Sequence, residues 1–187
     1  MRIKEFRFLT TNDYFDLSFQ NWSRGAEYGY ILNELKASNT IKTLHNTACG
    51  FGGVHLDFAR RLEGLDIQVF NSDMNHSDVF NNFKVFNLLK TSEERYDCCL
   101  CISVLEDFQS EELTKLAISN LLEQANNRLI ITADIFDKVD VRWFWEAFRP
   151  GEPYIPLGTE NVLTGSTSPY KQDEFNYIKI LLIDVIK

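Results

Sequence analysis

The chain has 187 residues, of which 44% are hydrophobic, and its 27 acidic residues exceed its 19 basic ones, giving a net charge of −8. This length and apolar content suit one globular domain with a packed core and exclude an intrinsically disordered chain. The negative charge disfavours a nucleic-acid substrate, because affinity for nucleic acids comes largely from neutralising phosphates with Lys and Arg. A small molecule, a sugar or a protein substrate fits better.

The sequence has no segment typical of membrane insertion or secretion. Its longest apolar runs, residues 98–105 and 178–186, have the length of strands, whereas a span needs ~20 residues. The N-terminal residues MRIKEFRFLTTND lack the apolar stretch and the cleavage site of a signal peptide. We therefore expect a cytoplasmic protein with no membrane partner, and the sequence leaves its oligomeric state open.

The cysteines are predicted to be buried apolar side chains in a reducing compartment. Three of them fall on one predicted strand, where neighbouring side chains point to opposite faces. Zinc requires four ligands at suitable spacing, and this cluster does not supply them. No metal site is expected from Cys49, Cys98, Cys99 and Cys101.

Hydrophobic periodicity predicts helices alternating with strands. Residues 12–37 are expected to form one or two helices, because Tyr28, Ile31 and Leu35 keep helical spacing. Further helices are predicted at residues 53–62, after Ser110 and at 139–148. The predicted strands are residues 40–46, 66–71, 83–87, 97–103, 128–133, 162–164 and 177–187.

This alternation predicts an α/β fold, a three-layer sandwich around a mostly parallel seven-stranded sheet. The last two strands are joined without a clear helix, so the final strand is expected to be antiparallel. Short N-terminal helices are expected to lie over the functional edge of the sheet.

A glycine-rich turn within residues 42–58, KTLHNTACGFGGVHLDF, gives the strongest functional signal. Gly50, Gly52 and Gly53 carry no Cβ, so they allow positive φ angles and close approach of a ligand to the main chain. The helix that follows offers unpaired N–H groups and the positive end of its dipole. Asp73 follows Gly50 by 23 residues, near the spacing at which an acid on the second strand reaches a ribose. The sequence therefore predicts a nucleoside-binding site.

The turn by itself fits two families. It matches a dinucleotide-binding fingerprint with Ala48 in place of the first glycine, and the D-x-G-x-G-x-G turn of class I S-adenosylmethionine (SAM) methyltransferases with Asn46 and Ala48 as departures. Other segments resemble the methyltransferases in order and spacing over most of residues 20–135. These segments are WSRGAEYGY at 22–30, FKVFNLL at 83–89, YDCCLCISVLEDF at 96–108 and RLIITAD at 128–134.

The resemblance implies one methyltransferase-like domain with a helical cap at 1–38, a SAM-binding core at 39–135 and, at 136–187, a helix, an acceptor loop and closing strands. Ribose, adenine and the transferred methyl group would lie near Asp73, Asn87 and Ser103, respectively. Asp73 and Asn87 also fit plain turn caps, and Arg24 fits a surface ion pair. The implied cofactor contacts are Arg24, Asn46, Ala48, Cys49, Gly50, Gly52, Asp73, Met74, Asn87, Leu88, Ser103 and Val104.

The implied reaction is methyl transfer from SAM to an oxygen or nitrogen of a small-molecule or sugar acceptor. Orientation and exclusion of water can supply most of the acceleration, so a dedicated base is not required. The candidate catalytic residues are Glu106, Asp107 and His55, with Asp134 behind them. Each of these also fits a structural role.

Two alternatives stay open. Asn46, Ala48, Asn87 and Asp107 depart from the family pattern and support a catalytically silent, methyltransferase-like binding or scaffold protein. A nicotinamide-dependent oxidoreductase would use the same turn. The missing Tyr-x-x-x-Lys pattern and the match at 96–108 disfavour it.

Overall fold

The computed structural model describes residues 1–19, 22–158, 160–165 and 178–187. The helices are α1 (Trp22–Lys36), α2 (Gly53–Glu63), the 3-10 turn η1 (Leu105–Phe108), α3 (Glu111–Gln124) and α4 (Val141–Phe148). The strands are β1 (Arg2–Phe8), β2 (Thr43–Thr47), β3 (Gln68–Asp73), β4 (Phe83–Val85), β5 (Tyr96–Ile102), β6 (Ala125–Ile135), β7 (Thr164–Gly165) and β8 (Ile178–Ile186). Among these residues, no helix has the length and apolar character needed to cross a bilayer.

All strands belong to one sheet with the order β1-β8-β6-β5-β2-β3-β4, and β7 pairs with β8. Strands β2 to β6 pair in parallel, whereas β8 is antiparallel to both β6 and β1. The predicted mostly parallel sheet with an antiparallel last strand is therefore confirmed.

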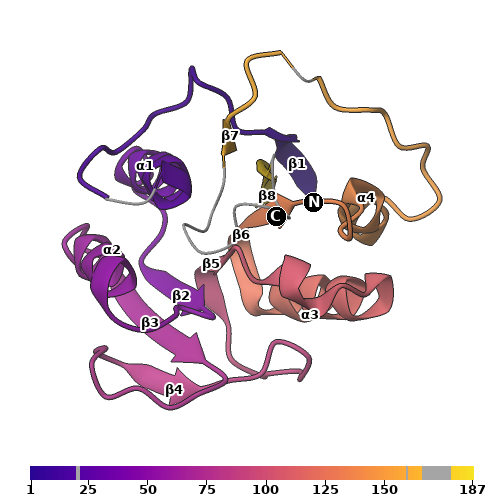
Figure 1. Cartoon of the computed structure of the whole chain (residues 1–187). Helices are drawn as coiled ribbons and strands as arrows, with labels where there is room; N and C mark the ends of the chain where they lie inside the picture. The colour runs from indigo at the N-terminus through magenta and orange to yellow at the C-terminus, as the bar shows by residue number, and fades with distance from the viewer. Residues whose placement is uncertain (20–21, 159, 166–177) are drawn as a thin grey trace.

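Two hydrophobic cores lie on opposite faces of the sheet. Figure 1 shows α1 and α2 on one face and α3 and α4 on the other. Along β5, Cys98 and Leu100 belong to the core under α1 and α2, whereas Cys99 and Cys101 belong to the core under α3 and α4. The sheet is thus the middle layer of the predicted three-layer sandwich.

Cys98, Cys99 and Cys101 contribute to these cores as small apolar side chains, and Cys49 lies in a separate small cluster with Ala59 and Phe80. All four are buried free thiols, and burial raises the pKa of Cys49, Cys99 and Cys101 to about 12. They are therefore protonated at neutral pH and poor nucleophiles.

The ends of the helices follow their local sequence. The Ser110 hydroxyl accepts a hydrogen bond from the Leu113 N–H at 3.4 Å and caps α3, as its place before two acidic residues predicts. The Gly64 N–H bonds to the Arg60 carbonyl at 3.1 Å and ends α2.

The N-terminal segment differs from the helical cap expected at residues 1–38. It begins with strand β1, which pairs with β8 at the edge of the sheet, and α1 follows as the described helix of this segment. A register shift between Ile3 and Glu5 interrupts the pairing. This bulge brings Ile3, Phe6 and Phe8 to one core although their spacing is not a strict alternation, which explains why the pattern was not recognised as a strand.

The strand predicted at residues 162–164 lies slightly later in the chain. The structure has a single bridge between Thr10 and Val162, and the pairing with β8 begins at Thr164. The two-residue β7 pairs antiparallel with the first residues of β8, so the predicted antiparallel final strand is present and its pairing with β7 is short.

A buried ionic network holds β1, α1, β6 and β8 together at the amino edge of the parallel strands. The Arg128 guanidinium donates to both carboxylate oxygens of Asp184, at 2.8 and 2.5 Å, and to Glu34 at 2.6 Å. The Tyr30 hydroxyl donates to Asp184 at 3.2 Å, and the Lys4 ammonium lies 3.4 Å from the same carboxylate. Asp184 is fully buried, so its charge depends on these partners.

Candidate functional site

The order of the strands defines a switch point between β2 and β5. These two parallel strands are neighbours, and the chain continues outward from them in opposite directions, to β3 and β4 on one side and to β6 and β8 on the other. In open α/β sheets, a crevice forms at the carboxyl ends of two such strands and is the usual place for a ligand. The segments that follow β2 and β5 are therefore the first candidates for a site.

The predicted glycine turn follows β2 directly. Its backbone takes positive φ at Ala48 (49°), Gly50 (68°), Gly52 (70°) and Gly53 (35°). A Cβ at Gly50 would lie 3.0 Å from the His55 ring, whereas one at Gly52 or Gly53 would meet no atom within 4 Å. The outer side of the turn is thus open main chain.

Asp73 at the end of β3 closes the turn. Its Oδ2 accepts the Gly50 N–H at 3.2 Å, and its Oδ1 accepts the Asn75 N–H at 3.2 Å. Each carboxylate oxygen has a second lone pair for a further hydrogen bond. Asp73 therefore caps the turn and can also accept bonds from a ligand, so the two readings of this residue are compatible.

Apolar side chains are exposed on both sides of Asp73. Met74 is 64% exposed and Phe51, within the glycine turn, is 48% exposed. Two accessible large apolar side chains beside a carboxylate suit a ligand with an apolar ring and polar hydroxyl groups.

The residues after β4 lie next to the end of β3, because the Phe86 N–H donates to the Asp73 carbonyl at 2.9 Å. The side-chain oxygen of Asn87 accepts the Leu89 N–H at 2.9 Å, so this oxygen caps a local turn. Leu88 is buried, and its carbonyl accepts the Asn120 side chain at 2.9 Å.

Two predicted contacts lie inside the protein rather than on the open turn. The Asn46 amide is buried and donates to the Asn71 side chain at 2.9 Å, linking β2 to β3. The Cys49 side chain is buried as well, and its N–H bonds to the Ser72 carbonyl at 2.9 Å. These residues connect the turn to β3 on its buried side.

Helix α1 reaches the other side of the switch point through Glu27. This fully buried carboxylate accepts hydrogen bonds from Arg24 at 2.7 Å, from Thr132 at 2.5 Å and from the Ser103 hydroxyl. Ser103 follows β5 with φ at 47°, and Thr132 lies on β6. Arg24 and Glu27 are therefore part of a buried network and not a surface pair.

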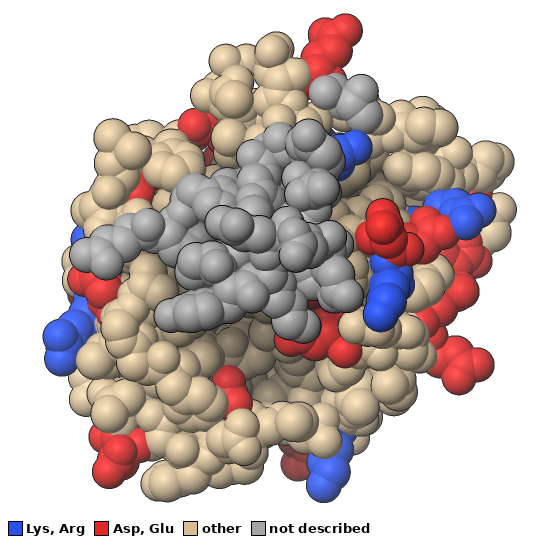
Figure 2. All heavy atoms as spheres, viewed as in Figure 1, with Lys and Arg blue, Asp and Glu red and all other residues tan. Residues whose placement is uncertain are grey.

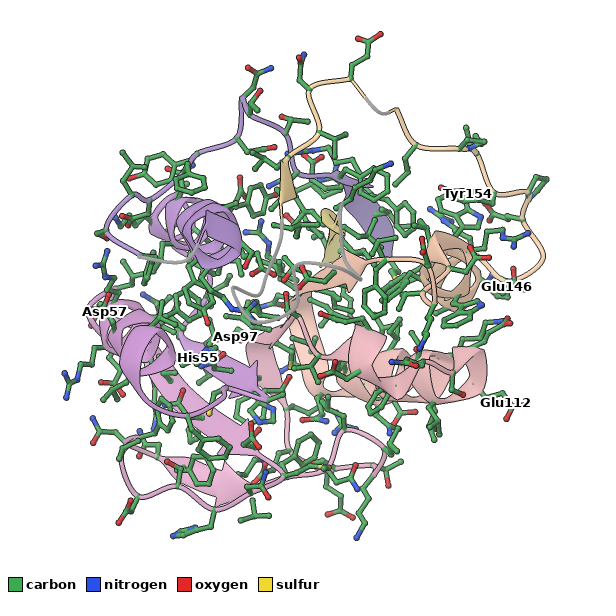
Figure 3. All side chains as sticks on the ribbon, viewed as in Figure 1. His55, Asp57, Asp97, Glu112, Glu146 and Tyr154 are labelled. Carbon is green, nitrogen blue, oxygen red and sulfur yellow. The ribbon has the colours of Figure 1, made fainter. Side chains whose placement is uncertain are left out.

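A second contact joins α1 to α2. The Tyr28 hydroxyl lies 2.7 Å from His55 Nδ1, and the Tyr28 ring stacks on Phe58 at 3.9 Å. Burial lowers the pKa of His55, and the Arg24 charge lowers it further, so the imidazole is neutral near pH 7. In Figure 3, His55 lies on the side of α2 that faces the sheet, whereas Glu112 on α3 points away from the protein.

Two carboxyl groups, each with a buried oxygen, lie at the carboxyl ends of β5 and β6. Glu106 on η1 is only 4% exposed. Within the described part of the chain, Glu106 Oε2 and Asp134 Oδ1 are buried and have no hydrogen-bond partner. Burial raises the pKa of Glu106 well above its ordinary value, with the Asp134 charge adding to the effect. Burial and the Glu27 charge raise the pKa of Asp134 to about 7.

Asp107 is different from its neighbour, because it is exposed. Partial desolvation raises the pKa of Asp107 and the Arg24 charge lowers it. The structure thus brings Glu106, Asp107 and Ser103 to one side of the switch point and His55 to the other.

The roles of Glu27 and Thr132 were not predicted from the sequence. Their contact joins residues 105 positions apart, so no local pattern could reveal it. The available signals were an acid among the apolar residues of α1 and a polar residue near the end of the apolar strand β6.

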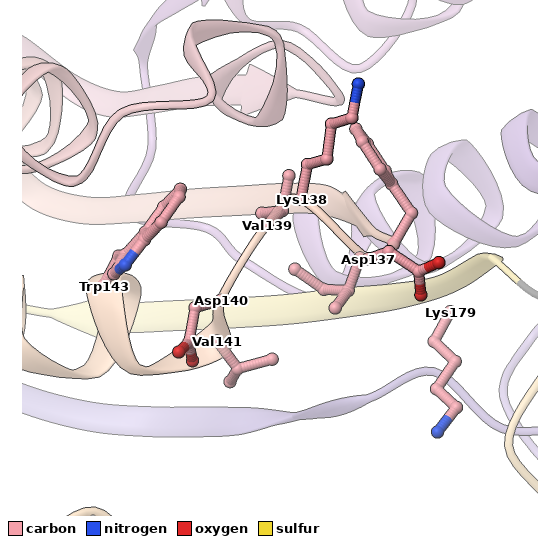
Figure 4. Close-up of a pocket in the computed structure, with 9 residues that line it drawn as sticks. Asp137, Lys138, Val139, Asp140, Val141, Trp143 and Lys179 are labelled. Carbon is pink, nitrogen blue, oxygen red and sulfur yellow. The ribbon is translucent and has the colours of Figure 1, made fainter.

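An open pocket of 570 Å³ lies at the carboxyl end of β6 and begins at Ile135 (Figure 4). It is formed by the connection between β6 and α4 and by the start of β8. Its volume is within the range of small-molecule sites. The lining consists of residues 135–141, Trp143 and Lys179.

No protein-family model matches the chain, and a search of curated protein sequences finds no match either. Solved structures do match it.

Magnesium protoporphyrin IX methyltransferase (ChlM) from Synechocystis PCC 6803, with bound SAM, has a TM-score of 0.55 and 19% identity, over 86% of this chain and 77% of that one. The N-methyltransferase NodS from Bradyrhizobium japonicum WM9, in complex with S-adenosylhomocysteine (SAH), has a TM-score of 0.53 and 12% identity, over 84% of each chain. A TehB-like SAM-dependent methyltransferase from Corynebacterium glutamicum ATCC 13032 has a TM-score of 0.52 and 13% identity, over 84% and 86%. The chain therefore has the fold of the class I SAM-dependent methyltransferases.

Proposed function

We propose that the protein is a SAM-dependent methyltransferase that transfers a methyl group to an oxygen or nitrogen of a small-molecule or sugar acceptor. The observation that carries this proposal is the open glycine turn closed by Asp73 at the switch point of the sheet. The structures of this fold reported with bound SAM or SAH support the choice of cofactor.

The residues around the turn fit the adenosine part of SAM. Asp73 would accept hydrogen bonds from the ribose hydroxyls with its free lone pairs. The exposed side chains of Phe51 and Met74 and the segment around Asn87 and Leu88 would enclose the adenine.

The residues around Glu27 would hold the methionine part. Arg24 uses one of its guanidinium nitrogens to bind Glu27, so its other N–H donors remain for the cofactor carboxylate. Ser103 and Val104 follow β5 and would form the floor below the methyl group. When bound, SAM supplies an electrophilic methyl group on a sulfonium. Asn46, Ala48, Cys49, Gly50 and Gly52 would shape the main chain that holds it.

The pocket at the connection between β6 and α4 is proposed as the acceptor site. It combines the Trp143 ring with polar and charged side chains, among them Lys138 and Lys179. Figure 2 shows Lys and Arg side chains lying singly and interspersed with Asp and Glu on the visible part of the face that it draws. That distribution, together with the net charge of −8, favours a small acceptor over a nucleic acid.

Calorimetric titration of the purified protein with SAM, SAH and NADH tests the proposal. We expect micromolar binding of SAM and SAH and none of NADH. Binding of neither SAM nor SAH by a folded sample would contradict the proposal and favour the silent scaffold. Binding of NADH alone would favour an oxidoreductase.

A further inference from the structure

We propose that Asp134, supported by Glu106, is the proton acceptor for the nucleophile that becomes methylated. This inference rests on the proposed function. It adds to it a catalytic group and a class of acceptor, namely one whose nucleophilic atom carries a proton that must leave, such as a hydroxyl or a neutral amine.

The geometry that supports this role is an unsatisfied pair of carboxyl groups. Most buried polar atoms in proteins are hydrogen-bonded, because a buried polar atom without a partner is energetically unfavourable. A buried carboxyl oxygen without a partner therefore points to a functional role. Within the described residues, one such oxygen belongs to Glu106 and the other to Asp134. The backbone N–H of Asp134 donates to the Glu106 carboxyl, so the two groups are held against one another.

The pair lies where the proposed reaction would take place. Asp134 is two residues beyond Thr132, whose hydroxyl binds Glu27 together with that of Ser103. The residues after Asp134, from Ile135 to Val141, line the 570 Å³ pocket. Asp134 therefore lies beside the residues proposed to hold the methyl group, and the pocket begins with the next residue, Ile135.

The groups that face Asp134 come from three directions. Helix α1 contributes Arg24 and Glu27, and η1 contributes Glu106 and Asp107. On β8, the residue in register with Asp134 is the apolar Ile180. Carboxyl groups outnumber the single cation Arg24 in this set, so the positions favour retention of a proton.

These surroundings raise the pKa values of both Glu106 and Asp134. Burial raises the pKa of Glu106 well above its ordinary value, so this group holds its proton more readily than an exposed Glu. Burial raises the pKa of Asp134 to about 7, which is the range in which a general base is effective. Asp134 can therefore take up a proton at physiological pH.

The step balances in atoms and charge. As the acceptor heteroatom forms its bond to the methyl carbon, the carbon–sulfur bond breaks and its electron pair goes to sulfur. The proton of the heteroatom goes to the Asp134 carboxylate, and it is later released to water. The positive charge of the sulfonium is thus replaced by one proton on the protein.

Proton release on binding tests the inference without knowledge of the acceptor. SAM and SAH differ by the methyl group and by the positive charge on sulfur. A positive charge next to Asp134 lowers its pKa and expels its proton, whereas the neutral thioether does not. Calorimetric titrations near pH 7, in two buffers of different ionisation enthalpy, report the number of protons released by each ligand.

We expect SAM to release a larger fraction of a proton than SAH. In Asp134→Asn this difference should vanish, while both ligands still bind. Asp66→Asn is a matched control, because Asp66 is exposed at the opposite edge of the sheet and its φ of 58° is tolerated by Asn. This control should release protons as the wild type does.

Equal proton release by SAM and SAH in the wild type would overturn the inference and leave the proposed function intact. A difference that persists in Asp134→Asn would also overturn it, because another group would then be responsible. Loss of all binding in the wild type would instead remove the proposed function itself. The wild-type comparison requires no variant, so it decides the question even if Asp134→Asn does not fold.

Discussion

Ionisable side chains at the switch point are less accessible to water than the sequence suggests. Asp134 is the clearest case, because burial and the Glu27 charge raise its pKa to about 7. The ordinary value for Asp is 3.8. The folded protein therefore holds a proton on this group between about pH 4 and pH 7, whereas the unfolded chain has lost it.

This difference predicts how stability depends on pH. The folded state binds more protons than the unfolded state in this interval, so the contribution of Asp134 to stability is complete below pH 4 and is lost as the pH rises through 7. The Asp134→Asn variant has no such proton. Relative to the wild type, its free energy of unfolding should rise by about 1–4 kcal/mol between pH 4 and pH 8.

Urea unfolding of both proteins across this pH range measures the effect. Asp66→Asn serves as the control and should follow the wild type at every pH. A constant difference between Asp134→Asn and the wild type would mean that Asp134 has an ordinary pKa in the folded protein.

Glu27 gives a second prediction at this scale. Glu27→Gln removes the charge that pairs with Arg24 and replaces one acceptor oxygen with a donor facing the hydroxyl groups of Ser103 and Thr132. We expect a loss of about 2–4 kcal/mol in the free energy of unfolding, because a buried charge is left unpaired. Thr132→Val removes a single hydrogen bond and should lose only about 1 kcal/mol. Equal losses in urea unfolding would show that Glu27 is no more important than one hydroxyl.

At the scale of elements, the ionic network at the amino edge of the parallel strands holds strand β1 at the edge of the sheet. Asp184→Asn weakens the two bonds to Arg128 and leaves that guanidinium partly unpaired among β6, β8 and α1. The expected loss is about 3–5 kcal/mol, the range for breaking one partner of a buried ion pair. Lys4→Met, on the more exposed side of the network, should lose less than about 1 kcal/mol.

Thermal or urea unfolding of the two variants measures this ratio. A small effect of Asp184→Asn would mean that water replaces the lost bonds and that the network is not a structural clamp.

The elements that were predicted from the sequence are those with local signals. The helix after Gly53 has apolar residues at helical spacing, and the glycine turn marks the end of the strand before it. Ser110 announces the start of α3 by its position before Glu111 and Glu112. These parts agree with the structure within a few residues at each end.

Strand β1 was missed because a bulge breaks its alternation, and because its partner β8 lies at the other end of the chain. The carboxyl cluster shows the same limit. Asp73 could be predicted, since its distance from Gly50 along the chain is characteristic. The contacts of Glu27 with Thr132 and of Glu106 with Asp134 depend on which strand ends become neighbours, and the sequence alone does not specify that.

In the whole molecule, the sheet order separates the strands that hold the two chain ends from the strands that form the switch point. The first and last strands lie side by side, with Arg2 opposite Ile186, and both ends of the chain are thereby fixed to one side of the sheet (Figure 1). The switch point between β2 and β5 has the glycine turn and Asp73 on one side. The Glu27 network and the buried carboxyl pair lie on the other side. This arrangement would place the proposed cofactor binding and the proposed acceptor chemistry on adjacent strands.

The central claim is that the turn and Asp73 hold the nucleoside of SAM. The most direct measurement is the affinity for SAH of the wild type, of Asp73→Ala and of the control Asp78→Ala, whose side chain is exposed on the loop after β3, all by calorimetry. We expect the control to bind as the wild type does and Asp73→Ala to bind more weakly by about 1–3 kcal/mol, the scale of unpaired buried polar groups. Unchanged affinity of folded Asp73→Ala, or no binding by the wild type, would contradict the claim.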